Sequence, residues 1–531
     1  MLPLENITFG ELLSRTARKY PDHPAVWHGG STVSYAQLEA AVRLCARRFL
    51  ALGVKRGDRA AVLTDPGLEG ITAMYALMYI GAAAAMLNTS LSVPELLTML
   101  GQTRPRLLLL GHSEREQDGF APRFAGVDMP SSIEHTVLLE RGAGALPLLT
   151  DLPCAPETEL DTAYAAVTPQ DTAMILFTSG STSCPKAVCT SHYSRVNGGI
   201  QQAHDLAATA DDRFCVAMPV YHCFCVSGNL FAALAVGACV CLPHDRHTAN
   251  VIDTVQKARC TVLNSVPTMF RAMLAKEDFS PARVASLRIG IIAGAGCSPE
   301  EFERIQHSFD RGFTLMSSLG QTECTAGLTV CNIGDPLAVR SHTVGHFMSH
   351  VEGKIVDLAS GAELPVGGVG EICVRGYLTM QGYFDDPGAT ADTLDADGWV
   401  HTGDLGRLDV DGNITLCGRC KELIIRGGEN INPVEIEHAL AKDPAVAECK
   451  VVGVPDAHFG EEICACIHLA DGASADADAV RERLRPQLAY FKLPRYIVFL
   501  DDLPKTQKGA VGGGECRRAA MRELFGLTWK I

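Results

Sequence analysis

Two similar strand–helix–strand segments constrain the fold of this chain more than any other feature of its sequence. In each, an Asp-Arg pair opens an apolar strand, and a glycine followed by small residues ends the next apolar stretch. The first segment contains Asp58-Arg59 and Gly81, and the second contains Asp212-Arg213 and Gly237. A glycine that ends a helix before a buried strand is typical of parallel α/β sheets. The pattern predicts two related α/β lobes, unless the likeness is a coincidence between two common α/β segments.

These segments include two uncharged stretches that raise the question of a membrane span. Residues 70–87 and 221–243 contain no Asp, Glu, Lys or Arg, and each is long enough to cross a bilayer. A continuous spanning helix has no need of the glycine that interrupts each stretch. The sequence therefore predicts a helix, a glycine cap and a buried strand in both places, and no membrane span.

Shorter signals support the same α/β class. Ser34 with Gln37, and Ser298 with Glu301, have the spacing of residues that cap a helix N-terminus. Between such helices lie strand-like runs at 174–177, 261–266 and 288–294. Helices that alternate with short apolar strands favour a layered α/β fold.

At 531 residues the chain is too long for one hydrophobic core, so more than one folding unit is expected. From about residue 360 to 418 it becomes rich in Gly, Asp and short β runs, which indicates a β-rich lobe. Farther on, Asn432 is placed to cap a helix that begins at Pro433. We expect a large N-terminal domain over residues 1–419, with two related α/β lobes and the β-rich lobe. A small α+β domain would follow over 420–531.

The charge balance excludes some partners. The net charge is −15, which disfavours nucleic acid or an anionic membrane as the main partner. Twenty cysteines are spread thinly through the chain, so a compact disulfide framework is not expected and a reducing compartment fits better. The first residues, MLPLENITFGELL, have no basic region ahead of an apolar core. The expected location is therefore the cytoplasm.

A loop rich in Thr, Ser and Gly carries the first chemical signal. The run FTSGSTSCPK at 177–186 follows a predicted buried strand and ends in a lysine. Small residues let backbone N–H groups approach phosphate oxygens, hydroxyls add donors, and Lys186 supplies a positive charge. The spacing is not that of the G-x-x-x-x-G-K-[ST] loop. Taken alone, the run is equally compatible with an ordinary turn.

Four further motifs follow in order: SSLGQTE at 317–323, HTGDLG at 401–406, GRCKELIIRGGENINPVEIE at 418–437 and LPKTQKGA at 503–510. Together with the loop they resemble the adenylate-forming superfamily of acyl-CoA synthetases, aryl-CoA ligases, luciferases and peptide-synthetase adenylation domains. The resemblance extends from SYAQLEAA at 34–41 into the C-terminal domain. It implies an AMP-forming acid–CoA ligase that uses ATP, Mg²⁺ and CoA, with a C-terminal domain that moves during the reaction.

The resemblance also implies a role for each motif residue. The ATP phosphates would be held by Thr178, Ser179, Gly180, Ser181, Thr182 and Lys186. The rest of the nucleotide would contact Gly294, Ala295, Gly296, Ser318, Leu319, Gly320, Gln321, Thr322, Asp404 and Arg419. The acyl pocket would include His222, Cys223, Ser317, Gly320, Cys324 and Thr325, and CoA would pass Gly427, Gly428 and Glu429. Glu323 would hold Mg²⁺, and Lys421 would be the hinge. The alternatives without function are a solvated surface acid for Asp404 and a charged residue at the start of a helix for Glu323.

The implied reaction has two halves. A carboxylate attacks the α-phosphorus of MgATP to give an acyl-adenylate and pyrophosphate, and a thiol then displaces AMP. Lys186, His222, Thr322 and Glu323 would take part in catalysis, with Thr322 near the α-phosphate. His222 would close the pocket beside the carboxylate, although a neutral core histidine is the alternative. No aspartate stands where amino-acid-activating relatives hold an α-amino group, so a fatty or aryl acid without that group is expected.

The sequence departs from the family pattern at Ser183, Ala187, Leu319 and Ala510. The last matters most, because the family has a lysine after Gly509 that bridges the carboxylate and ATP. Loss of one such stabilising group commonly costs about 10²–10³ in rate. We therefore expect slow adenylation and a retained thioester half-reaction. The sequence does not say whether the alanine is natural or introduced, or whether Lys508 substitutes.

Other functions stay open at this stage. A protein that binds nucleotide and acyl-adenylate without turnover, or an enzyme that transfers the acyl group to an amine or carrier-protein thiol, would share these motifs. Metal or redox chemistry is not expected, because Cys417 and Cys420 lack a second pair at zinc-site spacing. The C-x-C pairs at 223/225, 239/241 and 464/466 would place both sulfurs on one strand face.

Overall fold

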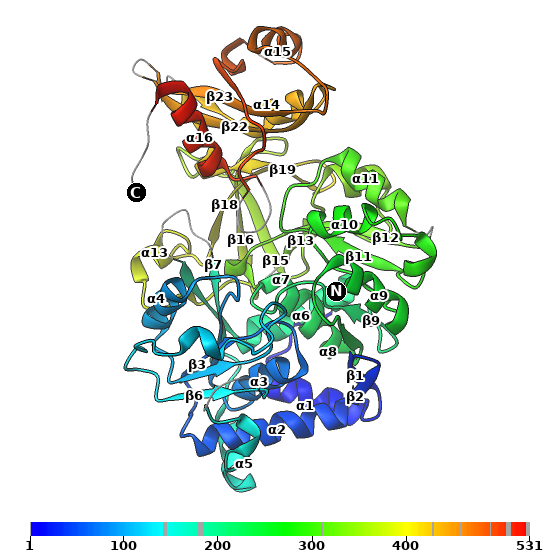
Figure 1. Cartoon of the computed structure of the whole chain (residues 1–531), viewed down its shortest axis with the longest axis vertical. Helices are drawn as coiled ribbons and strands as arrows, with labels where there is room; N and C mark the ends of the chain where they lie inside the picture. The colour runs from blue at the N-terminus through cyan, green and yellow to red at the C-terminus, as the bar shows by residue number, and fades with distance from the viewer. Residues whose placement is uncertain are drawn as a thin grey trace. The chain divides into compact units, whose positions relative to one another are not determined.

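The computed structural model describes residues 2–141, 146–178, 185–309, 312–325, 327–426, 429–456, 459–488, 490–505 and 511–526 (Figure 1). Two compact units are present: residues 1–353 with 373–401, and residues 354–372 with 402–531. The chain passes from one unit to the other within strands β15 (Val351–Val356), β16 (Gly370–Gly376) and β18 (Val400–Leu408). The predicted boundary at 419/420 lies inside the second unit, and a hinge there stays a prediction.

The first unit is built on a seven-stranded sheet whose middle is parallel. In spatial order the strands are β17 (Gly382–Tyr383), β8 (Lys186–Ser191), β7 (Thr172–Thr178), β4 (Ala83–Met86), β3 (Arg59–Leu63), β5 (Leu107–Leu110) and β6 (His135–Leu138). The five strands from β7 to β6 pair in parallel, and β8 and β17 add antiparallel neighbours. Strands β4 and β5 are buried along their whole length, which explains their continuous apolar sequences.

The two strand–helix–strand segments are confirmed. In the first, α3 (Leu68–Tyr79) connects the parallel strands β3 and β4. In the second, β9 (Arg213–Cys215) and β10 (Cys239–Leu242) pair in parallel around a helical connection. Gly81 and Gly237 have φ of +73° and +80°, which is the left-handed conformation that favours glycine after a helix. None of the helices among the described residues is long and apolar enough to cross a membrane.

Two smaller sheets complete the first unit. Their orders are β2 (Ser31–Ser34), β1 (Pro24–His28), β10, β9, and β11 (Ile289–Ile292), β12 (Thr314–Gly320), β13 (Gly327–Val330), β14 (His346–Phe347). The run 261–266 is not the strand we predicted, since it makes only isolated bridges at Val262 and Ser265. The side chain of Asn264 accepts the Ile291 N–H at 3.0 Å, and this side-chain bond takes the place of a continuous backbone ladder.

Helices cover these sheets. They are α1 (Phe9–Lys19), α2 (Tyr35–Ala51), α4 (Val93–Thr103), α5 (Glu157–Ala166), α6 (His192–Asp205), α7 (Cys223–Cys225), the π-helical η3 (Val226–Phe231), α8 (Ala232–Val236), α9 (Thr248–Ala258), α10 (Pro267–Leu274), α11 (Pro299–Ser308), α12 (Leu337–His342) and α13 (Pro387–Ala391). Short 3₁₀ turns lie at η1 (Ala121–Phe124), η2 (Leu149–Asp151), η4 (Pro281–Val284) and η5 (Thr322–Cys324). Ser34 and Gln37 form the predicted capping box, and Ser298 accepts the Glu301 N–H.

The second unit contains β19 (Ile414–Arg419), which ends the sheet β15-β16-β18-β19, and a five-stranded sheet. Its elements are η6 (Cys420–Glu422), β20 (Ile424–Arg426), β21 (Glu429–Ile431), α14 (Pro433–Leu440), β22 (Val446–Asp456), β23 (Gly460–Leu469), α15 (Ala477–Leu484), η7 (Tyr490–Lys492), β24 (Tyr496–Phe499) and α16 (Gly513–Phe525). The predicted cap is confirmed, because Asn432 accepts the Val434 N–H at 3.0 Å. The α+β class predicted for this region is also confirmed.

The C-x-C pairs differ from one another. Cys239 and Cys241 lie on β10, and Cys464 and Cys466 lie on β23, as predicted. The prediction for 223/225 is wrong, because these residues form the helical turn α7. A π-helical segment follows directly in the chain and continues the helix. Short apolar runs occur both in buried strands and in buried helices, so the sequence pattern alone could not tell which of the two residues 223–225 form.

Candidate active site

The structure describes both ends of the predicted phosphate-binding loop. Thr178 is the last residue of β7 and Lys186 is the first of β8, and the two are paired across the antiparallel ladder. The predicted phosphate ligands Ser179, Gly180, Ser181 and Thr182, together with Ser183, lie outside the described residues. A hairpin ladder therefore fixes where the loop leaves the sheet and where it returns.

Lys186, Tyr383 and Glu323 form a connected group beside this loop. The Lys186 ammonium lies 4.6 Å from the centre of the Tyr383 ring, a cation–π contact. The Tyr383 hydroxyl donates to Oε1 of Glu323 at 2.8 Å. Burial and the Glu323 carboxylate raise the pKa of Tyr383, so the phenol keeps its proton. Sequence analysis missed Tyr383, because β17 contains only two residues and carries no recognisable motif.

Glu323 fits a role as a ligand of Mg²⁺. Its Oε1 is engaged by Tyr383, and Oε2 accepts no hydrogen bond from the described residues. The Met380 N–H donates to the Glu323 carbonyl at 2.8 Å, which fixes the backbone at this point. Mg²⁺ is usually bound through one or two carboxylates together with phosphate oxygens and water. Glu323 meets that requirement, because Tyr383 holds Oε1 in place while Oε2 can bind the metal ion.

The structure brings the predicted SSLGQTE and His222 segments together. The Thr322 hydroxyl lies 3.7 Å from the Cys223 sulfur, and Gln321 Nε2 lies 3.6 Å from the Cys324 sulfur. His222 directly precedes α7, and its ring lies 4.9 Å from that of Tyr221. Segments about a hundred residues apart in the chain thus meet at Thr322.

The predicted adenine-binding segments are also neighbours. Strands β11 and β12 pair in parallel with Ile292 opposite Ser317, so the turn Gly294, Ala295, Gly296 leaves the sheet next to the strand that ends at Gly320. Gly294 has φ of +83°, which explains a glycine at the start of this turn. The hydroxyls of Ser317 and Ser318 donate to the carbonyls of Arg340 and Thr329, both at 2.7 Å. The Leu319 N–H donates to Thr329 Oγ1 at 3.1 Å.

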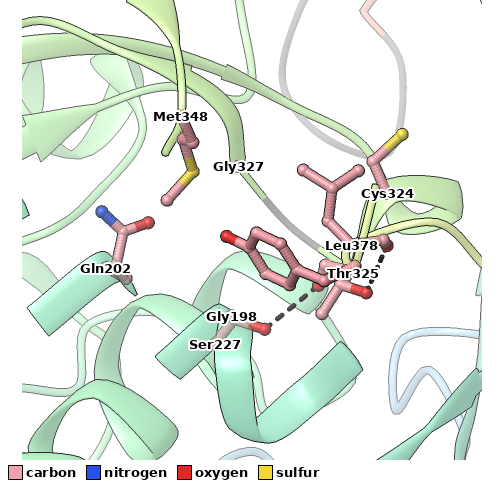
Figure 2. Close-up of a pocket in the computed structure, with 9 residues that line it drawn as sticks. Gly198, Gln202, Ser227, Cys324, Thr325, Gly327, Met348 and Leu378 are labelled. Carbon is pink, nitrogen blue, oxygen red and sulfur yellow. Dashed lines mark hydrogen bonds between the residues drawn. The ribbon is translucent and has the colours of Figure 1, made fainter. Parts of the chain in front are cut away.

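Thr325 has a strained backbone. Its φ of +62° and ψ of −39° are rare for a β-branched residue. Its hydroxyl donates to the Leu378 carbonyl at 2.6 Å, and its own carbonyl accepts from Ser227 Oγ at 3.1 Å (Figure 2). The same carbonyl accepts from Nη1 of Arg195 at 2.8 Å. Three hydrogen bonds therefore hold a conformation that costs about 1–3 kcal/mol, as is common at functional sites.

Arg195 is a second residue that sequence analysis missed. It is fully buried in α6, and its guanidinium also donates to Thr190 Oγ1 at 2.8 Å and to Ser227 Oγ at 3.2 Å. Burial lowers its pKa, but a guanidinium stays charged at neutral pH. Within the described residues no carboxylate lies within ion-pair distance of it. Nothing in the sequence distinguishes this arginine, because an arginine in a helix is usually exposed and belongs to no motif here.

In the second unit, Asp404 and Arg419 meet as predicted. They are paired across strands β18 and β19, and Arg419 Nε donates to Asp404 Oδ1 at 2.7 Å. Asp404 is 5 % exposed, and its N–H donates to Thr402 Oγ1 at 3.1 Å. Of the other predicted residues here, Gly427, Gly428 and Ala510, and the side chains of Lys421 and Glu429, lie outside the described residues.

Comparison with known proteins shows the family to which the chain belongs. Residues 13–384 match the family described as AMP-binding enzyme, and residues 435–510 match the AMP-binding enzyme C-terminal domain. YngI of Bacillus subtilis, which carries the name of an acyl-CoA synthetase, is 35% identical over 99% of this chain and 100% of its own. The mitochondrial medium-chain acyl-CoA ligase ACSF2 of Mus musculus is 31% identical over 96% of this chain and 86% of its own.

Solved structures of similar proteins contain nucleotides. ATP-bound MatB from Rhodopseudomonas palustris matches with a TM-score of 0.82 at 27% identity, over 98% of this chain and 100% of its own. The anthranilate CoA ligase AuaEII with anthranoyl-AMP matches with 0.84 at 25% identity, over 99% of each chain. The o-succinylbenzoate coenzyme A synthetase MenE of Bacillus subtilis, with ATP and magnesium, matches with 0.79 at 27% identity, over 95% and 98%.

Proposed function

Because the chain belongs to the AMP-binding enzyme family and is an AMP-forming acyl-CoA synthetase or ligase, we propose that it works in two steps on a carboxylic acid. MgATP first converts the acid to an acyl-adenylate with release of pyrophosphate, and the thiol of CoA then takes the acyl group and releases AMP. The observation that carries this proposal is the group of Lys186, Tyr383 and Glu323 at the ends of the Thr178 loop. It supplies a cation and a carboxylate where MgATP chemistry needs them.

The first step brings a carboxylate toward a polyphosphate, so positive charge must offset the repulsion. Lys186 is the proposed phosphate ligand, and the cation–π contact with Tyr383 orients its ammonium. Glu323 is the proposed ligand of Mg²⁺, which would neutralise phosphate charge when bound. Thr322, placed by η5 one residue before Glu323, is proposed to contact the α-phosphate. The loop residues 178–182 are proposed to hold the remaining phosphate oxygens.

Asp404 is the proposed ligand of the ribose hydroxyls. A carboxylate accepts two hydrogen bonds, and Arg419 on Oδ1 holds it in one orientation. Gly294 to Gly296 and Ser318 to Gln321 are proposed to flank the base. Leu319 is proposed to pack on adenine, with less contact area than an aromatic ring provides.

For the second step, the residue assignments are supported by the sequence motifs of the chain. Gly427, Gly428 and Glu429 are proposed to lie along the pantetheine arm, and residues 420–531 are proposed to turn about Lys421. The acid is proposed to be fatty or aryl, without an α-amino group, with His222 beside its carboxylate. ACSF2 is named for medium-chain acyl groups and AuaEII for anthranilate. These two substrate classes are therefore the first to test. An amine or a carrier-protein thiol is the alternative acyl acceptor.

A turnover assay tests this proposal directly. The full chain is incubated with MgATP, CoA and graded fatty and aryl acids, and AMP and thioester are measured separately. Acid-dependent release of both is the expected result. AMP release that needs the acid but not CoA would mean that water hydrolyses the adenylate, and an amine or a carrier-protein thiol would then be supplied in place of CoA. Binding of acyl-adenylate without release of either product would favour a binding protein and contradict the proposed enzyme.

A further inference from the structure

Cys223 begins a helix next to residues of the proposed active site. It is the first residue of α7, and the helical chain continues through η3 and α8 to Val236. The Thr322 hydroxyl donates to the Cys223 sulfur at 3.7 Å, and His222 precedes Cys223 in the chain. Cys223 is half-buried, so the residue is open in part to solvent. A thiol therefore contacts the hydroxyl that is proposed to bind the α-phosphate.

A buried positive charge lies beside the same helix. Arg195 is fully buried, and its Nη1 donates to Ser227 Oγ at 3.2 Å. Ser227 follows Cys223 by four residues, and residues with this spacing are neighbours on a helix surface. Nη2 of Arg195 has no hydrogen-bond partner among the described residues. The ionisable group whose charge acts on the guanidinium is the Cys223 thiol. Within the described part of the chain, this thiol is therefore the anionic partner available to Arg195.

Three features stabilise a thiolate at Cys223. The positive charge of Arg195 attracts it, and the charge on either group stabilises the charge on the other. The Thr322 hydroxyl donates to the sulfur, and a hydrogen bond to the charged form favours that form. The start of a helix also favours negative charge. Thiols in such surroundings are commonly ionised at neutral pH, and the thiolate is the form that reacts with electrophiles.

Other cysteines of the first unit lack this combination. Burial raises the pKa of Cys225, two residues along the same helix, to about 12, and negative charge on Cys223 adds to the effect. Burial together with Glu301 raises the pKa of the half-buried Cys297 to about 12. Cys154 is exposed, but it lies in a loop and has no helix start beside it. Cys223 is therefore expected to react before these three thiols.

We propose that Cys223 is a modification site, a thiolate held by Arg195 and Thr322 that hydrogen peroxide oxidises to the sulfenic acid. The sulfur attacks one peroxide oxygen, an S–O bond forms as the O–O bond breaks, and the departing hydroxide takes up a proton to become water. Oxidation alters the sulfur that accepts from Thr322 and so slows adenylation. This last effect rests on the proposed function, whereas the reactivity of the thiol does not.

Competitive labelling measures the reactivity. The full chain is treated at neutral pH with a substoichiometric amount of iodoacetamide, and mass spectrometry quantifies the label on each cysteine. Cys223 is expected to react about 5- to 10-fold faster than the more exposed Cys154. Arg195→Met is expected to remove this advantage, and Arg195→Lys, which keeps the charge, to retain most of it. A wild-type rate at Cys223 no higher than at Cys154 would overturn the proposal, and this comparison needs no substitution of a buried residue.

Peroxide treatment measures the consequence for adenylation. Hydrogen peroxide is removed with catalase after the treatment, and acid-dependent AMP release is compared with that of the untreated protein. The wild-type rate is expected to fall about 10-fold or more and to recover with dithiothreitol, since the sulfenic acid is reversible. Cys223→Ala is expected to keep its own untreated rate. Cys154→Ala is the matched control, and it is expected to stay as sensitive as the wild type.

The outcomes separate this inference from the proposed function. Selective labelling of Cys223 without loss of AMP release after peroxide would overturn the effect on adenylation and leave the ligase function intact. Inactivation that persists in Cys223→Ala would overturn it as well. Absence of AMP release with every acid before any treatment would contradict the proposed function. The labelling rates would still decide whether Cys223 is the reactive thiolate.

Discussion

At the scale of single residues, the proposed functional residues of each unit include groups that sequence motifs mark and groups that only packing reveals. Lys186, Glu323 and Asp404 belong to motifs that a reader of the sequence can find. Tyr383 and Arg195 touch those motif residues or the turn beside them, yet neither belongs to a pattern. A motif records which side chains the chemistry needs. It does not record which neighbours hold them.

The alanine at position 510 gives the sharpest test of the adenylation step. Ala510→Lys is expected to raise acid-dependent pyrophosphate exchange by about 10²–10³, since it restores a cation to the attacking carboxylate and ATP. Ala510→Met is the control for side-chain length without charge. Thioester formation from preformed acyl-adenylate is expected to change little. An exchange rate that does not rise would mean that the missing cation is supplied elsewhere.

Asp205 predicts a pH dependence of stability. Burial raises the pKa of its carboxyl from 3.8 to about 6, against a smaller opposing effect of His346. The native state therefore disfavours the charged form, and stability falls as pH rises from about 4 to about 6. Asp205→Asn is expected to be more stable than the wild type above pH 6 by up to about 3 kcal/mol, and equal to it below about pH 4.

Denaturant unfolding across this pH range measures the Asp205 effect. A difference between the two proteins that stays constant with pH would show that the titration of Asp205 is not its cause. Asp211→Asn, on an exposed position a few residues along, is a suitable control for the loss of one negative charge.

At the scale of elements, the glycines that end the two related helical connections are structural necessities. Gly237 combines a φ of +80° with close packing, because a Cβ there would lie 2.3 Å from the Tyr20 ring. Gly57 has a similar φ of +84° but no atom within 4 Å of its Cβ position. Substitutions at Gly57 and Gly237 therefore distinguish the cost of backbone strain, which both share, from the cost of steric overlap, which only Gly237 has.

Gly57→Ala is expected to cost about 1–2 kcal/mol of unfolding free energy, from the left-handed backbone alone. Gly237→Ala is expected to cost about 1–3 kcal/mol more, because Tyr20 and the helix end must move apart. Chemical denaturation of both variants measures the difference. Equal losses would show that the helix end relaxes without a steric penalty.

At the scale of the whole molecule, the proposed turn about Lys421 has a specific cost within the second unit. The Asn432 side chain caps α14 and also donates to the Cys417 carbonyl on β19. Residues 417 and 432 lie on opposite sides of position 421. A rotation of residues 420–531 against β19 must therefore break the bond between Asn432 and Cys417, but not the cap.

Asn432→Asp is expected to change the balance of the two half-reactions without unfolding the protein. Aspartate keeps the helix cap, but it loses the N–H donor to Cys417. One net hydrogen bond corresponds to a change of about 2- to 10-fold in the ratio of adenylation to thioester formation. Asp476→Asn, at the cap of α15, is the control. If both variants leave the ratio unchanged, residues 420–531 do not turn at Lys421.

Much of the architecture followed from local patterns. The paired strand–helix–strand segments, the capping box at Ser34, the N-cap at Asn432 and the buried strands are each set by a few neighbouring residues. Where contacts with distant residues decide whether a segment forms a strand or a helix, the prediction was wrong. Residues 261–266 did not form a strand, because Asn264 bonds to Ile291, and 223/225 became helical although the same spacing at 239/241 lies in a strand.

The sequence alone determined the α/β class, the helix ends and the residues whose chemistry suits MgATP, because these depend on residue type and short spacing. The tertiary structure decided what surrounds those residues: the Tyr383 hydroxyl on Glu323, and the buried Arg195 guanidinium on the Thr325 carbonyl. These contacts join segments far apart in the chain. Their energies come from burial, which removes water as a competing partner, and burial is a property of the folded molecule as a whole.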